Sequence, residues 1–257
     1  MPESSIEHGF VNGPGGTHTS RTIMLGELEL LLESTPADAD YVAYETTVLD
    51  ENVLMKGTDS TRRRTLRGLR ELYGLQRDVI LFSALRDLWE DNAESRPVLA
   101  MLSACARDPL LRASGSVILE AQVGDDVLSA ELAAAVKDAF PGRYNPNTLA
   151  KIGRNAASSW QQSGHLKGRI SKTRVQVKPT SASTAYALLL GHLCGQRGEA
   201  LFETLWARLL DVPVHTLHEL ALQASRQGWI DYRHTGAVTE ITFHYLLRDN
   251  DNQERAT

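Results

Sequence analysis

Basic side chains are concentrated along this chain in a way that could bind a polyanion. Residues 139–198 contain no aspartate or glutamate, although the whole chain has 32 of them against 27 lysines and arginines. Such segregation creates a local positive potential on an acidic molecule and steers it toward a polyanion. The alternative is a solvated face that merely lacks carboxylates. The cations of this window are Arg143, Lys151, Arg154, Lys167, Arg169, Lys172, Arg174, Lys178 and Arg197.

A second basic cluster precedes this window, and polar side chains accompany the cations of the window. Five arginines lie between positions 62 and 70, ahead of the next acid, Glu71. Side-chain amides and donors of these kinds suit both base edges and phosphates. We therefore predict contacts to DNA from both stretches. The candidate DNA-binding residues are Arg62, Arg63, Arg64, Arg67, Arg143, Asn147, Thr148, Lys151, Arg154, Asn155, Lys167, Arg169, Lys172, Arg174 and Lys178.

Two other chemistries that use phosphates are not supported by spacing. Residues 13–22 hold glycines, hydroxyls and Arg21, but they lack the G-x-x-x-x-G-K-[ST] spacing of a phosphate loop and follow no predicted strand. Glu71 and Asp87, with nearby arginines, suggest a nuclease centre. Metal-dependent nucleases generally set their carboxylates on sheet edges, and the sequence predicts no such sheet. We therefore expect no catalytic residues and no small-molecule substrate.

Metal and thiol chemistry are also not expected. His215 and His218 lie one helical turn apart and could hold a metal, but the sequence suggests no third ligand near them. Cys105 and Cys194 lack the spacing of zinc ligands or of an activated nucleophile. Both sit among apolar residues, which is typical of buried reduced thiols in a cytosolic protein. The sequence therefore predicts no metal and no cofactor.

Helical periodicity dominates residues 21–121. Leu66, Leu69 and Leu72, for example, recur at spacings of three and place one apolar face on a helix that Ser60 or Thr61 can cap. Short helices of this kind follow one another with brief turns and hardly any strand signal. The pattern predicts an all-helical bundle. Residues 1–20, rich in glycine and hydroxyls, have no helical period and predict a flexible arm.

After residue 121 one order of elements occurs twice: a helix, a short turn, a second helix and a hairpin. This is the order of a winged helix-turn-helix, whose second helix can enter a DNA major groove while the hairpin contacts the backbone or the minor groove. The second copy carries Glu219, Asp231 and Glu240, so we expect it to pack, dimerise or bind DNA more weakly. The predicted elements are 127–140, 147–162 and 166–178 in the first copy, and 199–210, 214–227 and 229–245 in the second.

The predicted fold class is mainly α, with an N-terminal helical bundle followed by tandem winged-helix-turn-helix-like units with small β-hairpins. No apolar run reaches the roughly 18–20 residues that cross a bilayer, and residues 1–8 are acidic without an apolar core, so we expect a cytoplasmic protein without a signal peptide. The predicted parts are a flexible arm (1–20), a bundle (21–121), a DNA-binding unit (122–180), a second unit (181–247) and a disordered tail (248–257).

Several stretches together resemble the BrxA family of bacterial BREX phage-defence systems, which are small helical proteins compared in turn with the NusB antitermination factor. The resemblance extends over most of the chain, although the arm at residues 9–19 is longer than expected for the family. It is carried by Gly15-Gly16 leading into the helix 25–33, by Glu51-Asn-Val-Leu54 followed by Thr61-Arg-Arg-Arg64, and by Arg143-Tyr144 leading into residues 148–164 and Leu166.

The resemblance implies a double-stranded DNA-binding accessory protein without catalysis of its own. Such a protein would act with other components of an anti-phage system, namely a methyltransferase, an ATPase and a phosphatase-like protein. Three alternatives stay open on the sequence: a sequence-specific transcriptional regulator of the winged-helix type, an interaction scaffold that meets an acidic protein and no nucleic acid, and an RNA-binding protein.

Overall fold

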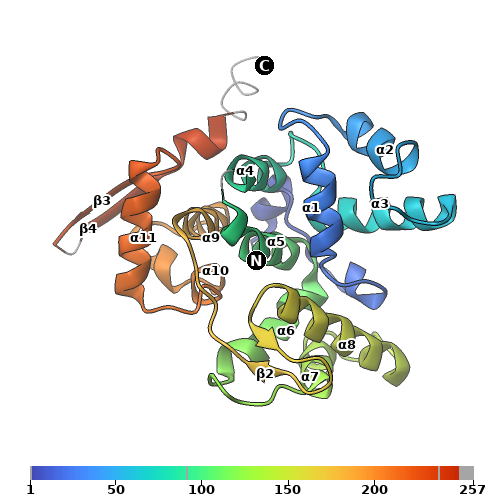
Figure 1. Ribbon diagram of the computed structural model, residues 1–257. Coiled ribbons are helices and arrows are strands. Elements are labelled where there is room, and N and C mark those ends of the chain that lie inside the picture. Colours follow the sequence, from blue (N-terminus) through green and yellow to red (C-terminus); the bar gives the residue numbers. More distant parts are fainter. Residues whose placement is uncertain (1, 91, 237, 249–257) are drawn as a thin grey trace.

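The computed structural model describes residues 2–90, 92–236 and 238–248, and over this range the fold is mainly helical with two small antiparallel hairpins (Figure 1). The predicted tail lies outside the described residues except for Arg248. The helices of the N-terminal part are the 3₁₀ helix η1 (Glu3–His8), the 3₁₀ helix η2 (Thr17–Thr19), α1 (Leu25–Glu33), α2 (Tyr41–Leu49), α3 (Asp59–Tyr73), α4 (Ile80–Trp89), the 3₁₀ helix η3 (Ala93–Ser95) and α5 (Arg96–Arg107).

Helix α3 illustrates how the sequence sets the bundle. Thr58, two or three residues before the expected cap, accepts a hydrogen bond from the Thr61 amide and satisfies one otherwise unpaired first-turn donor. Leu66, Leu69 and Leu72 are buried, as their spacing predicts. The arginines between these leucines consequently point away from the core.

The core of the bundle is built on α4, α5 and α9 (Ser181–Leu193), which lie together at the centre of the molecule (Figure 1). Helix α9 is buried along nearly its whole length. The Tyr186 hydroxyl donates to the Leu81 carbonyl of α4 at 2.9 Å. A helix that belongs to the second unit by sequence order is therefore also a core helix of the bundle.

A compact unit follows α5. Its elements are α6 (Pro109–Glu120), α7 (Ser129–Ala139), α8 (Pro146–Gln162), β1 (Leu166–Lys167) and β2 (Thr173–Arg174). Helices α7 and α8 touch closely because a Cβ on Gly153 would lie 2.1 Å from the Ser129 carbonyl oxygen, so only glycine fits. Helix α6 joins this unit, since Trp160 of α8 donates to Ser114 of α6 at 2.9 Å. The sequence instead predicts α6 as part of the bundle of residues 21–121, because the helical period does not show which neighbour an apolar face packs against.

A short extended segment completes this first unit. Residues 124–127 run beside β2, where Asp126 forms an isolated antiparallel bridge with Thr173 and the Val127 amide donates to the Lys172 carbonyl at 2.8 Å. The hairpin pairs Leu166 with Arg174 and is only two residues long on each side. The predicted hairpin over 166–178 is therefore present but short.

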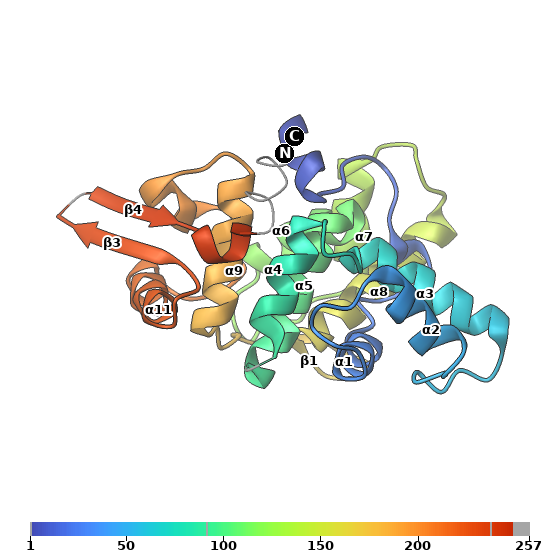
Figure 2. The ribbon, with the colours of Figure 1, turned by 90° about the horizontal axis from the view of Figure 1, so that it is seen from above.

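The second unit contains α9 and the elements after it, which are the 3₁₀ helix η4 (Gly198–Glu203), α10 (Leu205–Arg208), α11 (Val214–Arg226), β3 (Asp231–Thr235) and β4 (Val238–Thr242). The helix predicted over 199–210 is divided, because Thr204 leaves the helical conformation and caps α10 through the Ala207 amide. The hairpin β3–β4 and the pair α2–α3 lie at opposite ends of the molecule (Figure 2).

The N-terminal segment differs from the predicted flexible arm. Phe10 is buried, with its ring centroid 5.8 Å from that of Trp206, and Thr17 and His18 are buried beside α8. The composition of residues 1–20 is typical of a loop, but long-range contacts fix this segment against the body of the molecule. Among the described residues no helix combines the length and the apolar character that crossing a membrane requires.

Candidate nucleic-acid interface

A groove of about 920 Å³ separates the N-terminal segment from α3 and α8. Figure 1 shows the part of the N-terminal segment that leads into α1, in blue, between these two helices. Cations come to this groove from four different segments, and among the described residues that line it Glu71 is the one acid. The charged side chains that line it are Arg21, Arg64, Arg67, Glu71, Arg107 and Lys151.

The groove brings together side chains from the two basic stretches of the sequence. Arg64 and Arg67 come from α3, and Lys151 comes from the first half of α8. Within the described ranges none of these three forms an ion pair, and all three are exposed. Their positive charge is therefore available to an anionic ligand.

Buried hydrogen bonds dock the N-terminal segment against α6 and α8. Asp108 accepts from the His18 amide at 3.0 Å and contacts His18 Nδ1 at 2.8 Å, and the other ring nitrogen lies 2.8 Å from Ser159 Oγ. A Cβ on Gly16 would lie 2.2 Å from an Asp108 carboxylate oxygen, so glycine is required for this approach. Burial alone would raise the pKa of Asp108, but the His18 ring and backbone amides hold it below its ordinary value.

Asp108, His18 and Ser159 have the order of a hydrolase triad, but their surroundings serve a structural purpose. All three side chains are buried. The Ser159 hydroxyl donates to the Asn155 carbonyl at 2.9 Å, so its proton is directed away from the histidine that would have to remove it. This network fixes one wall of the groove.

The remaining predicted residues of α3 are not all directed at the groove. Arg62 donates to the Leu49 carbonyl and is half-buried. Arg63 pairs with Asp59 at 2.8 Å one turn earlier on the exposed face. The cluster 62–67 therefore divides into two arginines that line the groove and two that serve the helix and its neighbours.

Helix α8 presents an exposed polar strip. Asn147, Lys151 and Arg154 are exposed at spacings of four and three, which places them on one face, and Thr148 is half-buried beside them. Asn145 caps the helix by accepting from the Thr148 amide at 2.9 Å, so α8 begins one residue before the predicted range 147–162.

Asn155 has a role that differs from the predicted base contact. Its side-chain amide donates to the His18 carbonyl at 2.8 Å, which makes it part of the docking network of the N-terminal segment. This side of α8 is covered by the beginning of the chain, because Leu25 also donates its amide to the Gln162 side chain at 3.0 Å. The exposed strip Asn147, Lys151 and Arg154 is the part of the α8 surface that the N-terminal segment does not cover.

The hairpin β1–β2 contributes exposed cations at its loop and flanks. Lys167 and Arg169 are exposed, as is Lys178 after the hairpin. Lys172 is half-buried, donates to the Gly168 carbonyl at 3.2 Å, and has its pKa lowered by desolvation. Arg143, in the turn before α8, is exposed.

Arg174 is a correction to the predicted DNA-binding residues. Its side chain is only 3% exposed, pairs with Asp211 at 2.7 Å and donates to the Ile118 carbonyl at 3.0 Å. Arg174 lies directly opposite the buried Leu166 in the hairpin, and residues opposite each other in a ladder share one face. That face points into the molecule, so Arg174 joins the first unit to the second and is not part of a DNA-binding surface.

Two cations of the groove were not among the predicted residues. Arg21 follows η2, and Arg107, at the end of α5, donates to the Glu71 carbonyl at 3.0 Å and to the Gly9 carbonyl. No sequence signal links these residues to the distant α8, because the docking contact between His18 and Asp108 spans ninety positions. The groove exists only once that contact forms.

Comparison with models of known protein families and with curated proteins gives no match for this chain.

Proposed function

We propose that the protein is a non-catalytic accessory protein that binds double-stranded DNA through α8, the hairpin β1–β2 and the groove beside α3. The observation that carries the proposal is the convergence of Arg64, Arg67 and Lys151, free of ion pairs among the described residues, at one groove. Cations that hold no carboxylate partner bind phosphates without first breaking an internal pair.

The order of elements in the first unit supports its interpretation as a winged helix. Helix α6 is followed by the extended residues 124–127, by α7 and α8, and by a hairpin that pairs with the extended segment. In a winged helix, α8 holds the position of the recognition helix and the hairpin that of the wing. The exposed strip Asn147, Lys151 and Arg154 then faces the DNA, with Lys167 and Arg169 reaching the backbone beside it.

The second unit repeats the order with a different surface. Its elements follow in a comparable order, namely α9, η4, α10, α11 and the hairpin β3–β4. Its hairpin differs, because Asp231 and Glu240 are exposed on it. Carboxylates on a wing repel phosphates. We therefore assign the principal DNA contacts to the first unit.

The resemblance to the BrxA family gives this function its setting, in which the protein assists the other components of a BREX-type anti-phage system in discriminating phage from host DNA. The predicted partners are duplex DNA and those components. The setting is tested by deleting the gene in a host that restricts phage and asking whether restriction is lost.

Binding of duplex DNA is tested by replacing Arg64, Arg67, Lys151 and Arg154 with alanine together. If about six phosphates are contacted in the native complex, affinity falls by about three decades between 50 and 200 mM salt, and loss of four contacts lowers the salt slope by about 3.6. The matched control replaces four exposed arginines of the second unit, Arg197, Arg208, Arg226 and Arg233.

Gel shifts with duplex DNA, and competition by duplex RNA, measure both variants. The proposal requires that the first variant loses DNA binding while the control with the same change in net charge keeps it. Equal loss by both variants would place the interaction elsewhere. Preferential binding of RNA, or no binding of either nucleic acid by the native protein, would favour the RNA-binding or scaffold alternatives.

A further inference from the structure

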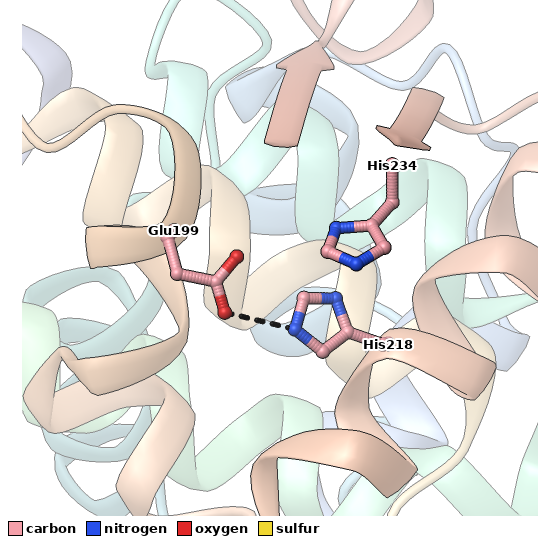
Figure 3. Close-up of side chains that lie close together, drawn as sticks. All are labelled: Glu199, His218 and His234. Atoms are coloured by element: carbon pink, nitrogen blue, oxygen red, sulfur yellow. Dashed lines mark hydrogen bonds and ion pairs between the residues drawn. The ribbon is translucent and has the colours of Figure 1, made fainter. Parts of the chain in front are cut away.

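Three side chains with metal-binding atoms meet in the second unit, away from the basic groove. Glu199 comes from η4, His218 from the middle of α11 and His234 from β3 (Figure 3). One ligand atom from each residue lies within 4.8 Å of the other two. The cluster therefore joins three elements that are separate in the sequence.

Hydroxyl groups orient the two imidazole rings. His218 Nδ1 lies 2.8 Å from the Tyr232 hydroxyl, and its Nε2 lies 3.0 Å from Glu199 Oε1. His234 Nδ1 lies 2.8 Å from Thr239 Oγ1. With both Nδ1 atoms engaged in this way, the Nε2 atoms are the ones that can bind a metal, and that of His218 already contacts the third member of the cluster, Glu199. Holding the second ring nitrogen with an outer partner is how proteins orient metal-binding histidines.

The carboxylate is oriented in the same way. The Thr239 hydroxyl donates to Glu199 Oε2 at 2.6 Å, so one threonine contacts two members of the cluster. Hydrogen bonds from Thr239 and His218 also hold the pKa of Glu199 below its ordinary value. The aromatic ring of Phe202 stacks on the His218 ring with centroids 4.1 Å apart and limits its rotation.

We propose that Glu199, His218 and His234 form a zinc site with a fourth coordination position open to water. Two imidazole nitrogens and one carboxylate oxygen suit Zn²⁺, and three protein ligands with an open position are a common zinc arrangement. A depression of about 560 Å³ is lined in part by His218, Tyr232 and His234, so the two histidines of the cluster border a space open to solvent.

The spacing of the ligand atoms is close to what zinc requires. Zinc–nitrogen bonds of about 2.05 Å in a tetrahedron place neighbouring ligand atoms about 3.4 Å apart. Glu199 and His218 are already 3.0 Å apart. The third ligand needs to approach by at most about 1.4 Å, and His234 is an exposed residue near the end of β3.

This site was not predicted, because the sequence shows only the pair His215 and His218. His215 is exposed and does not belong to the cluster. Glu199 lies nineteen positions before His218, and His234 lies sixteen positions after it. Only the pairing of β3 with β4 beside η4 brings the three residues together. His215 therefore offers a matched control one turn away on the same helix.

The test is a titration of the chelator-treated full-length protein with zinc alone, followed by calorimetry. We expect one zinc ion per chain, and visible absorption of tetrahedral type when cobalt(II) replaces zinc. The variants His218→Gln and His234→Gln should each weaken zinc binding by more than about 100-fold. The outer-partner variant Thr239→Val should weaken it by about 10- to 100-fold, and His215→Gln should leave it unchanged.

His234→Gln is the decisive variant because an exposed residue is replaced and folding is not at risk. If zinc were held by Glu199 and His218 without His234, His234→Gln would leave zinc affinity unchanged. Absence of saturable zinc binding, equal binding by the double variant His218→Gln/His234→Gln, or an equal loss in His215→Gln would each overturn the proposal. None of these outcomes depends on whether the protein binds DNA.

Discussion

The two units that follow the bundle share an order of elements but use their charged side chains differently. In the first unit Lys151, Arg154 and Lys167 are exposed without carboxylates beside them in the sequence. In the second, Glu199 engages His218 and the hairpin carries acids. The backbone order supplies a scaffold, whereas the surface side chains decide which ligand the scaffold can bind. We therefore expect phosphate binding at the first unit and metal binding at the second.

The two units also differ in how they meet. Asp211 lies in the turn before α11. Its carboxylate accepts from Arg174 at 2.7 Å, and its backbone carbonyl accepts from the Gln176 side chain at 2.8 Å. His165 of the first unit lies 2.9 Å from the Leu209 carbonyl of the second. One cation and one imidazole of the basic stretch are thus used for the joint between the units and not for a ligand.

The largest effect on this comparison should come from the buried ion pair of the joint. Asp211→Asn keeps the shape but leaves the Arg174 guanidinium without its counter-charge, and Asn tolerates the positive φ of this position. Removing one partner of a buried pair costs about 3–5 kcal/mol, and the 20% exposure of Asp211 favours the low end, about 3 kcal/mol. Urea unfolding measures the loss.

A matched control for the joint is Lys167→Ala, which removes an exposed cation from the same hairpin. Surface changes of this kind alter stability by about 0.5 kcal/mol or less. If Asp211→Asn were as stable as Lys167→Ala, the ion pair between Arg174 and Asp211 would not stabilise the fold. Arg174 would then return to the candidate DNA-binding residues.

The next effect concerns pH. Burial, reinforced by the nearby cation Arg174, lowers the pKa of His165 to about 4. Because the folded pKa lies below the unfolded value of about 6.5, the unfolded state binds more protons between these values. The stability from neutral His165 is therefore complete above about pH 6.5 and is lost as pH falls toward 4. At pH 5 the loss is about 2 kcal/mol.

Urea midpoints at pH 7 and pH 5 for the native protein and for His165→Gln measure this contribution. The variant should lose about 2 kcal/mol less between the two pH values. His192, whose burial also lowers its pKa to about 4, contributes with the same sign in both proteins and cancels in the comparison. The exposed control His215→Gln should follow the native curve, and an identical slope for His165→Gln would contradict the buried neutral state.

Periodicity predicted most of the helices but not the directions of the basic residues in the hairpin. The spacing of Leu66, Leu69 and Leu72 is enough to fix the inner face of α3, because a long helix repeats its pattern several times. Strands of two residues offer no alternation to count. Lys167 and Arg174 therefore look alike in sequence, although one is exposed and the other is buried.

The groove and the metal cluster show a different limit. Both depend on contacts between distant positions, His18 with Asp108 in one case and Glu199 with His218 and His234 in the other. Composition indicates a flexible arm at residues 1–20 because it reports local preference, whereas burial of Phe10 and His18 is decided by the surfaces they meet. Local pattern predicted the elements, and only their packing created the sites.

A smaller effect should separate the two hairpins as DNA-binding elements. Lys167→Ala/Arg169→Ala removes two exposed cations from the first hairpin and should weaken duplex binding by about tenfold while lowering the salt slope by about 2. In the second hairpin Arg233→Ala removes one exposed cation and should alter binding by less than about twofold, because the neighbours of Arg233 are acids. Fluorescence anisotropy at several salt concentrations measures both, and equal losses would remove the distinction between the units.

The smallest effect concerns the tip of the first hairpin. Ile170 is 99% exposed between Arg169 and Ser171, so the part of the chain that the structure describes offers no packing that would account for an apolar side chain there. Apolar side chains at the tips of DNA-binding elements can wedge between base steps in the minor groove. Ile170→Ser should leave stability unchanged within about 0.5 kcal/mol. It should weaken duplex binding by about fivefold. This loss of binding free energy is smaller than the gain from burying a whole isoleucine side chain. A hairpin that contacts only the phosphate backbone would show no loss, so anisotropy with this variant distinguishes a wing in the minor groove from a wing along its edge.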